Sequence, residues 1–154
     1  MRSRHFKDQP HRPLLVVDDS PEDCESLRRI LSKLGISNPV FFCTTGEQAI
    51  DYLFRSGEYV DPHTSPRPGI ILLDLNLPGT SGPEVLSLIK KHESLRRIPV
   101  IVLTSSDRPA DIEECYRRGA NSYIQKLADL DRFRHALDTL KWFWFEQALL
   151  PEGI

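Results

Sequence analysis

Five short apolar runs recur along the chain, and each is followed by a turn and then by a stretch with helical character. Short runs with few polar interruptions are typical of strands buried on both faces of a sheet. They are Leu14–Val17, Val40–Cys43, Ile70–Leu73, Val100–Leu103 and Ser122–Ile124. Because strands that alternate with helices favour βαβ crossovers, we predict an α/β fold, a doubly wound five-stranded parallel sheet with helices on both faces.

The segments between these runs contain residues that begin and end helices. Ser20 is suited to N-cap a helix, Pro21 to occupy its first position, and Asp23 to place an acid in its first turn. Gly35 and Gly119 stand where helices are expected to end. These signals support helices between the predicted strands.

Length and charge limit the classes of protein that fit this chain. Its 154 residues suit one domain, which we predict at 13–150 between a flexible N-terminal tail at 1–12 and a short C-terminal tail at 151–154. A net charge of −2 argues against binding nucleic acid through its phosphates. A local basic patch, Lys90-Lys91-His92 with Arg96-Arg97, is interpreted as a solvated helix face.

Apolar runs and cysteines bear on where the chain works. The apolar runs are far shorter than the roughly 20 residues of a membrane-spanning helix, and the first residues lack the apolar core of a signal peptide. Cys24, Cys43 and Cys115 are odd in number and form no CxxC pair, so neither a disulfide framework nor a zinc site is indicated. We therefore expect a cytoplasmic protein with no membrane partner.

Charged and hydroxyl side chains follow four of the five predicted strands. Asp18 and Asp19 come after the first, Asp74 after the third, Thr104 after the fourth and Lys126 after the fifth. In an open parallel sheet the carboxyl ends of the strands share one edge, where ligands bind. Carboxylates crowded at that edge repel one another, and a divalent cation relieves the repulsion. Oxygen ligands without cysteine or histidine select a hard ion, so we predict an Mg2+ site.

Taken singly, these residues have ordinary structural explanations, such as helix-dipole acids, turn residues or solvated charges. Their combination resembles the receiver (CheY-like) domain of two-component response regulators, which has a flavodoxin-like fold. The matching motifs, in order between Leu14 and Leu140, are Asp18-Asp19 after LLVV, Asp74 in LLDLNLPGTSG, Thr104 in VIVLTSS, and Tyr123 with Lys126 in ANSYIQK.

Two further segments resemble one group of receivers, the Rcp-type response regulators of cyanobacterial phytochromes. These segments are the insert GEYVDPHTSPRP and the aromatic ending WFWFEQALLP. The resemblance implies a single-domain response regulator of a phosphorelay, whose partner is a histidine kinase of phytochrome type. It also implies a signal that leaves by protein–protein contact, to a downstream protein that the sequence does not reveal.

The resemblance gives roles to the acidic residues. Asp74 is the expected nucleophile, which accepts a phosphoryl group from a phosphohistidine of the kinase. Asp19 and Asp74 are expected to bind Mg2+ directly, Asn76 through its backbone carbonyl, and Asp18 mainly through bound water. A stoichiometric acceptor of this kind is not an enzyme with turnover.

The resemblance also implies a switch. Lys126 is expected to place its charge against the phosphoryl oxygens, and Thr104 to donate its hydroxyl to them. The loop after the fourth strand would then move inward, and Tyr123 would rotate into the vacated space, altering the surface of the fourth helix, fifth strand and fifth helix. Leu127 stands where most receivers have a proline after a cis peptide bond, so the geometry of Lys126–Leu127 is left open. Rcp-type members commonly lack that proline as well.

Two other classes of protein remain as alternatives. A phosphohydrolase with an aspartyl nucleophile, as in haloacid-dehalogenase enzymes, calls for a second aspartate two residues after the first, where this chain has Asn76. A dinucleotide-binding domain calls for a GxGxxG turn after the first strand, where VVDDSPEDC has no glycine. Both features favour the receiver.

The end of the chain predicts a helix with more apolar surface than one core can cover. One stripe at helical spacing is expected to dock on the sheet, and its members are Leu130, Phe133, Leu137, Leu140 and Trp144. Trp142 and Phe145 lie off that stripe, and at least one of them should face outward. We therefore expect a homodimer through the last helix, in which Rcp-type relatives are similar.

Overall fold

The five predicted strands form one parallel sheet in the order β2-β1-β3-β4-β5. In the computed structural model, which describes residues 12–151, their bounds agree with the prediction except that β4 and β5 are each one residue longer. The strands are β1 (Leu14–Val17), β2 (Val40–Cys43), β3 (Ile70–Leu73), β4 (Val100–Thr104) and β5 (Ser122–Gln125). The order reverses between β1 and β3, which lie next to each other, and ligands bind at such a switch point in open parallel sheets.

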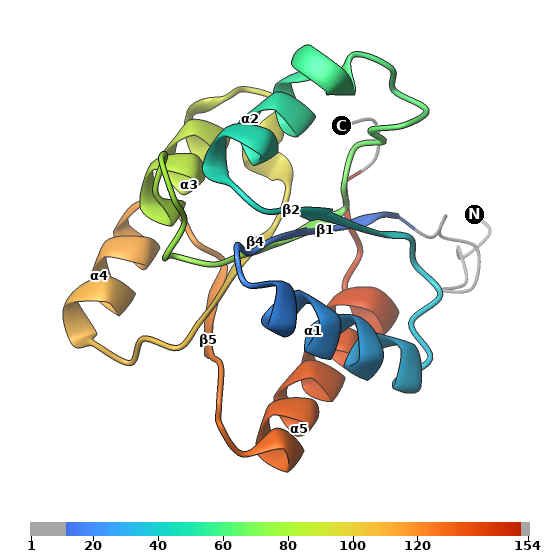
Figure 1. Ribbon diagram of the computed structural model, residues 1–154, viewed down its shortest axis with the longest axis vertical. Helices are drawn as coiled ribbons and strands as arrows, with labels where there is room; N and C mark the ends of the chain where they lie inside the picture. The colour runs from blue at the N-terminus through green and yellow to red at the C-terminus, as the bar shows by residue number, and fades with distance from the viewer. Residues whose placement is uncertain (1–11, 152–154) are drawn as a thin grey trace, which may run out of the picture.

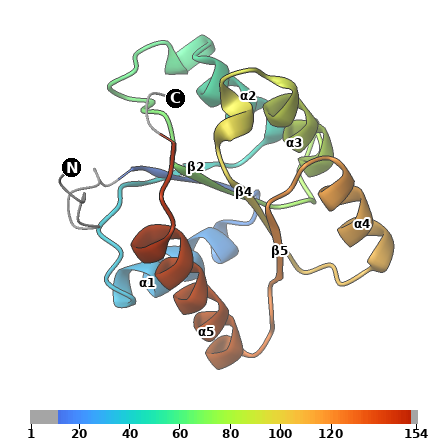
Figure 2. The same cartoon turned by 180° about the vertical axis from the view of Figure 1, so that it is seen from behind.

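Helices cover both faces of this sheet, as Figures 1 and 2 show from opposite sides. One face is covered by α1 and α5, and the other by α2, α3 and α4 (Figure 1). The helices are α1 (Pro21–Lys33), α2 (Gly46–Phe54), α3 (Gly82–Lys91), α4 (Pro109–Arg117) and α5 (Leu130–Leu140), with short helices η2 (Gly57–Tyr59) and η3 (Leu95–Arg97) and a π-helix, η4 (Lys141–Gln147), which continues α5.

Alternate side chains of each central strand enter two separate hydrophobic layers. In β1, Leu15 and Val17 face the layer that includes α2 and α3 residues, whereas Leu14 and Val16 face the layer beneath α1 and α5. All four are buried, and burial stabilises each such side chain by about 1.5–3 kcal/mol. The sheet is therefore a rigid frame for the residues at its carboxyl edge.

Helix ends follow the predicted chemistry. The Oγ of Ser20 accepts a hydrogen bond of 3.2 Å from the backbone N–H of Asp23 and so caps α1. Gly35 and Gly119 follow α1 and α4 with φ angles of 74° and 104°, a region that favours glycine. The predicted helix ends at these residues are confirmed.

The docking stripe of the last helix is only partly as predicted. Phe133, Leu137 and Leu140 of α5 are buried against the sheet, and Trp144 of η4 packs against the same layer. The prediction that Leu130 docks on the sheet is wrong, because this residue is 66% exposed. It is the first residue of α5, which begins away from the sheet and approaches it only further along (Figure 1).

The predicted tails lie almost entirely outside the described residues. Arg12, placed in the N-terminal tail by the prediction, accepts a 2.8 Å hydrogen bond at its carbonyl from the side chain of Asn38. Within residues 12–151, no helix is both long and apolar enough to cross a membrane.

Candidate functional site

The ends of β1 and β3 place two acids side by side at the switch point of the sheet. Val17 pairs with Leu73, so the next residues, Asp18 and Asp74, emerge at the same level. The N–H of Asp74 donates to the carbonyl of Val17 at 2.9 Å, which extends the pairing to the acid itself. Both residues are buried, with 4% and 8% of their surface exposed. Buried carboxylates are costly unless a positive charge or a metal pairs with them.

A third acid completes a cluster that could hold a metal. Carboxylate oxygens of Asp18, Asp19 and Asp74 all lie within 4.8 Å of one another. Asp19 is exposed whereas the other two are buried, so the cluster has one side open to solvent. An oxygen-only donor set with an open side suits a hard divalent cation that keeps several waters.

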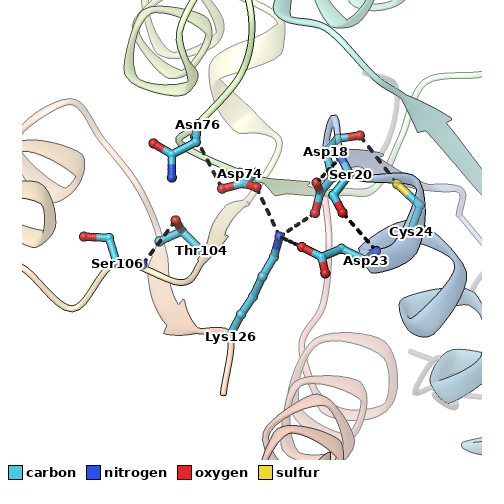
Figure 3. A network of polar contacts seen from close by, with 9 residues as sticks. All are labelled: Asp18, Ser20, Asp23, Cys24, Asp74, Asn76, Thr104, Ser106 and Lys126. Carbon is cyan, nitrogen blue, oxygen red and sulfur yellow. Dashed lines mark hydrogen bonds and ion pairs between the residues drawn. The ribbon is translucent and has the colours of Figure 1, made fainter. Parts of the chain in front are cut away.

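Lys126 reaches this cluster from the end of β5. Its Nζ donates to Asp18 Oδ2 at 2.5 Å, to Asp23 Oδ2 at 2.9 Å and to Asp74 Oδ2 at 3.1 Å (Figure 3). Its backbone N–H donates to the carbonyl of Thr104 at 2.7 Å, which fixes the base of the side chain against β4. The predicted convergence of the acids and the lysine is therefore present in the structure.

Charge pairing sets the ionisation of this group. Burial works to lower the pKa of Lys126, but its hydrogen bonds to Asp18 and Asp23 and the charge of Asp74 outweigh burial and raise the pKa above the ordinary value. Burial raises the pKa of Asp18, although Lys126 opposes the rise. The buried acid thus depends on a neighbouring cation to remain ionised.

The loop after β3 is held close to the site by tight backbone packing and by hydrogen bonds to α2. A Cβ on Gly82 would lie 2.3 Å from the carbonyl oxygen of Asp74, so no side chain fits there. Glu47 of α2 accepts hydrogen bonds of 2.7 Å from both the N–H and the hydroxyl of Thr80. Asn76 directs its N–H toward Asp74 Oδ1 at 3.4 Å, and the metal contact of its carbonyl stays a prediction.

Thr104 ends β4 next to the level of the acids. Because Leu73 pairs with Val102, Thr104 lies one residue beyond the level of Asp74 on the neighbouring strand. It is fully buried, and its hydroxyl oxygen lies 3.5 Å from the N–H of Ser106, which donates to it. This position suits a hydroxyl that exchanges a backbone partner for a ligand at Asp74.

Tyr123 is joined to the same loop. Its hydroxyl donates to the carbonyl of Ser106 at 2.9 Å, and the Ser106 hydroxyl donates to Asp111 of α4 at 2.6 Å. Ser106 therefore links Thr104, Tyr123 and α4. Sequence reasoning did not single out Ser106, because a serine in a loop carries no spacing signal of its own.

The sequence leaves the geometry of the peptide bond after Lys126 open, and the structure decides it. None of the described peptide bonds is cis, so Lys126–Leu127 is trans. Leu127 packs against the layer beneath α1 and α5. The loop that enters α5 is thus anchored by an apolar contact.

Comparison with known proteins decides the family. The model of the response regulator receiver domain matches residues 14–138. The chain belongs to this family. Response regulator Rcp1 of Synechocystis sp. is 37% identical to this receiver over 142 residues, which cover 92% of this chain and 95% of Rcp1.

Solved structures agree with the sequence comparison. The crystal structure of the phosphorylated cyanobacterial phytochrome response regulator RcpA has a TM-score of 0.86 and 36% identity, covering 93% of this chain and all of that one. The Mn2+-bound form of Rcp1 has a TM-score of 0.83 and 36% identity, covering 91% and 99%. The α/β fold and the relation to phytochrome response regulators are confirmed, and a phosphorelay role fits. A phosphohydrolase is not better supported.

The end of this receiver exposes aromatic surface. Trp142 is 56% exposed and Phe143 is 49% exposed, whereas Phe145 is partly buried and packs against the layer beneath α5. Of the two residues assigned to a dimer contact, Trp142 therefore faces outward and Phe145 does not. The outward aromatic beside Trp142 is Phe143, because η4 turns more slowly than the α-helix on which the prediction was based.

Proposed function

We propose that Asp74 accepts a phosphoryl group from a phosphohistidine of a histidine kinase, with Mg2+ bound at the acidic cluster. The observation that carries this proposal is the position of Lys126, whose Nζ lies 3.1 Å from Asp74 Oδ2 within a group of acids whose oxygens lie within 4.8 Å. A buried nucleophilic carboxylate beside a fixed cation is suited to phosphoryl transfer, which depends mainly on positioning and charge stabilisation.

The proposed phosphoryl transfer is a nucleophilic displacement at phosphorus. A carboxylate oxygen of Asp74 forms a bond to phosphorus, and the bond from phosphorus to the imidazole nitrogen of the kinase histidine breaks, so the electron pair leaves with the imidazole. Asp18, Asp19, Asp74 and the carbonyl of Asn76 are the groups that would hold Mg2+. When bound, the ion offsets the negative charge of the phosphoryl oxygens.

The acyl phosphate would rearrange the local contacts. The added charge at Asp74 attracts the ammonium of Lys126, and a phosphoryl oxygen offers the Thr104 hydroxyl an acceptor. Ser106 then loses or shifts its contact to Thr104, and its links to Tyr123 and α4 carry the change to the surface of α4, β5 and α5. The proposed switch is a population shift between two packings of this loop.

The kinase we propose is of phytochrome type, because RcpA, a phytochrome response regulator, resembles this chain over nearly its whole length. The signal would pass to a downstream protein through contacts with the receiver. Three buried, unpaired cysteines suit the reducing cytoplasm as its compartment.

Self-association through η4 is part of this proposal. Trp142 and Phe143 place two exposed aromatic side chains next to each other on the end of the chain, and aromatic side chains are enriched in interfaces. Sedimentation of the wild type should show dimers that Trp142→Ala weakens, while the partly buried Phe145 is left intact. A wild type that stays monomeric at tens of micromolar, roughly the range of weak interfaces, with and without phosphodonor, would refute the dimer.

Incubation with a small phosphodonor such as acetyl phosphate and Mg2+ tests the main proposal. The expected result is a burst of label that stops near one phosphoryl group per chain and needs the metal. Sustained release of phosphate with many turnovers per chain would instead support the phosphohydrolase. No label in the presence of Mg2+ would remove Asp74 as an acceptor.

A further inference from the structure

Two helices of this chain begin with the same arrangement of a serine followed three residues later by an acid. In α3, Ser81 and Glu84 form both hydrogen bonds of a capping box, at 3.4 Å and 3.3 Å. In α1, the Ser20 hydroxyl accepts from the N–H of Asp23, but the Ser20 N–H does not donate to the Asp23 carboxylate in return. The N–H of Ser20 donates to Asp18 Oδ1 at 2.9 Å instead.

The carboxylate of Asp23 is therefore not used to cap its helix. It accepts from Lys126 Nζ at 2.9 Å, as the third acidic partner of that ammonium (Figure 3). A capping box satisfies an otherwise orphaned N–H, so an acid at this position normally serves the helix. Because Asp18 has taken over that task, Asp23 is available to the functional site.

Asp23 differs from the other acidic partners of Lys126 in its exposure. Its side chain is 50% exposed, whereas those of Asp18 and Asp74 are 5% and 10% exposed. Exposed ion pairs are weak because water screens them, so the contact to Asp23 is the one that Lys126 gives up most easily. A cavity of about 100 Å³ between α1 and α5 borders both Asp23 and Lys126, which gives the ammonium room to shift without unpacking the core.

We propose that Asp23 is a positioning residue that holds Lys126 in the unphosphorylated receiver and competes with the phosphoryl group for its ammonium. The competition follows from charge. A phosphoryl group on Asp74 adds an anion next to Lys126, and the ammonium can turn fully to it only by leaving a carboxylate. The strength of the Asp23 contact then sets how tightly the site holds a phosphoryl group. This inference rests on the proposed role of Asp74.

Beryllium trifluoride, which binds carboxylates as a phosphoryl mimic, provides a direct test in Mg2+ buffer with the full chain. Fluorine NMR titration gives the affinity for the mimic. The fluorine chemical shifts also report the surroundings of the fluorine atoms, and an effect of the variant elsewhere in the fold would leave these shifts unchanged. Asp23→Asn should bind the mimic about threefold more tightly than the wild type, the size expected for loss of an exposed ion pair. The fluorine resonance nearest Lys126 should shift as well.

Glu22→Gln is the matched control. Glu22 is exposed in the same first turn of α1, so this variant removes one negative charge without removing a contact to Lys126. It should leave the affinity for the mimic at the wild-type value. In a Lys126→Gln background, Asp23→Asn should lose its effect, because the proposed competition is for that ammonium.

Two results would overturn the inference while leaving the proposed function intact. They are an Asp23→Asn affinity equal to that of Glu22→Gln, and an Asp23→Asn effect that persists in the Lys126→Gln background. A wild type that binds no beryllium trifluoride would overturn the role of Asp74, and the inference with it.

Discussion

Two half-buried lysines lie at opposite edges of the same sheet and meet different partners. Lys126, at the carboxyl edge, donates to three carboxylates. Lys90, at the end of α3, reaches the other edge and donates to the carbonyls of Arg96 and Ile98 at 3.2 Å and 2.8 Å and to Asn121 Oδ1 at 2.9 Å. Its three acceptors are neutral oxygens on the segments that lead into β4 and β5.

The charge of the acceptors distinguishes Lys90 from Lys126, the lysine to which we assign a function. Burial lowers the pKa of Lys90 to about 8, because neutral acceptors do not offset the lost hydration. For Lys126, carboxylate partners outweigh burial, and the pKa rises. Lys90 joins the segments that lead into two strands, whereas Lys126 has anionic partners, which the proposed phosphoryl group on Asp74 would partly replace.

The largest expected difference between the two lysines concerns transmission of the signal. Lys126→Ala should still accept some phosphoryl group at Asp74, but the change at Ser106 and Tyr123 should be lost, because the ammonium that joins β5 to the phosphoryl group is gone. Lys90→Ala should keep that change. Backbone amide NMR with and without acetyl phosphate measures it, and a full response in Lys126→Ala would contradict the assigned role.

Metal binding should depend on the carboxyl edge alone. Asp19→Ala removes an expected direct ligand and should weaken Mg2+ binding by about tenfold or more. Glu58→Gln, which removes an exposed acid on η2, should leave the Mg2+ affinity unchanged. A calorimetric titration compares them, and equal affinities in the two variants would remove Asp19 from the ligand set.

Stability should depend more on Lys90 than on its neighbour. Lys90→Ala should lower the free energy of unfolding by about 1–3 kcal/mol, since it removes hydrogen bonds from a charged donor to backbone carbonyls. Lys91→Ala, on the exposed side of α3, should change it by less than about 0.5 kcal/mol. Urea unfolding distinguishes them, and equal losses would show that Lys90 is a solvated charge.

The pH dependence of stability should also set Lys90 apart. The pKa of Lys90 is about 8 in the folded state and near its ordinary 10.5 when unfolded, so the unfolded chain binds more protons between these values. The wild type should therefore gain stability relative to Lys90→Ala as the pH rises from about 8 toward 10. Parallel pH profiles of the two proteins would contradict a depressed pKa.

The two lysines also show which contacts can be predicted from the sequence and which cannot. The strands and the positions of Asp18, Asp74 and Lys126 were predicted correctly. The pattern of apolar residues locates the strands, and residues that follow parallel strands lie at the same edge of the sheet. The solvated face assigned to Lys90 was wrong, because its amine turns inward to carbonyls that only the folded chain brings together. Helical periodicity likewise could not show that Leu130 lies beyond the sheet.

Asp23 illustrates the remaining gap. Its position three residues after Ser20 predicts that it lies in the first turn of a helix, and this prediction is confirmed. Its contact with Lys126 spans 103 residues of sequence and depends on Asp18 taking the N–H that a capping acid would use. Spacing within a helix cannot predict such a contact, because it depends on residues of other elements that only the folded chain brings close.

The role of Asp74 as phosphoryl acceptor is tested most directly by labelling the wild type and Asp74→Asn with a radiolabelled small phosphodonor and Mg2+, followed by peptide mapping. The wild type should take up about one phosphoryl group per chain, on the peptide that contains Asp74. Asp74→Asn should take up none while keeping the wild-type circular dichroism spectrum, because the amide preserves the shape but is not a nucleophile. Undiminished labelling of Asp74→Asn would show that another residue is the acceptor.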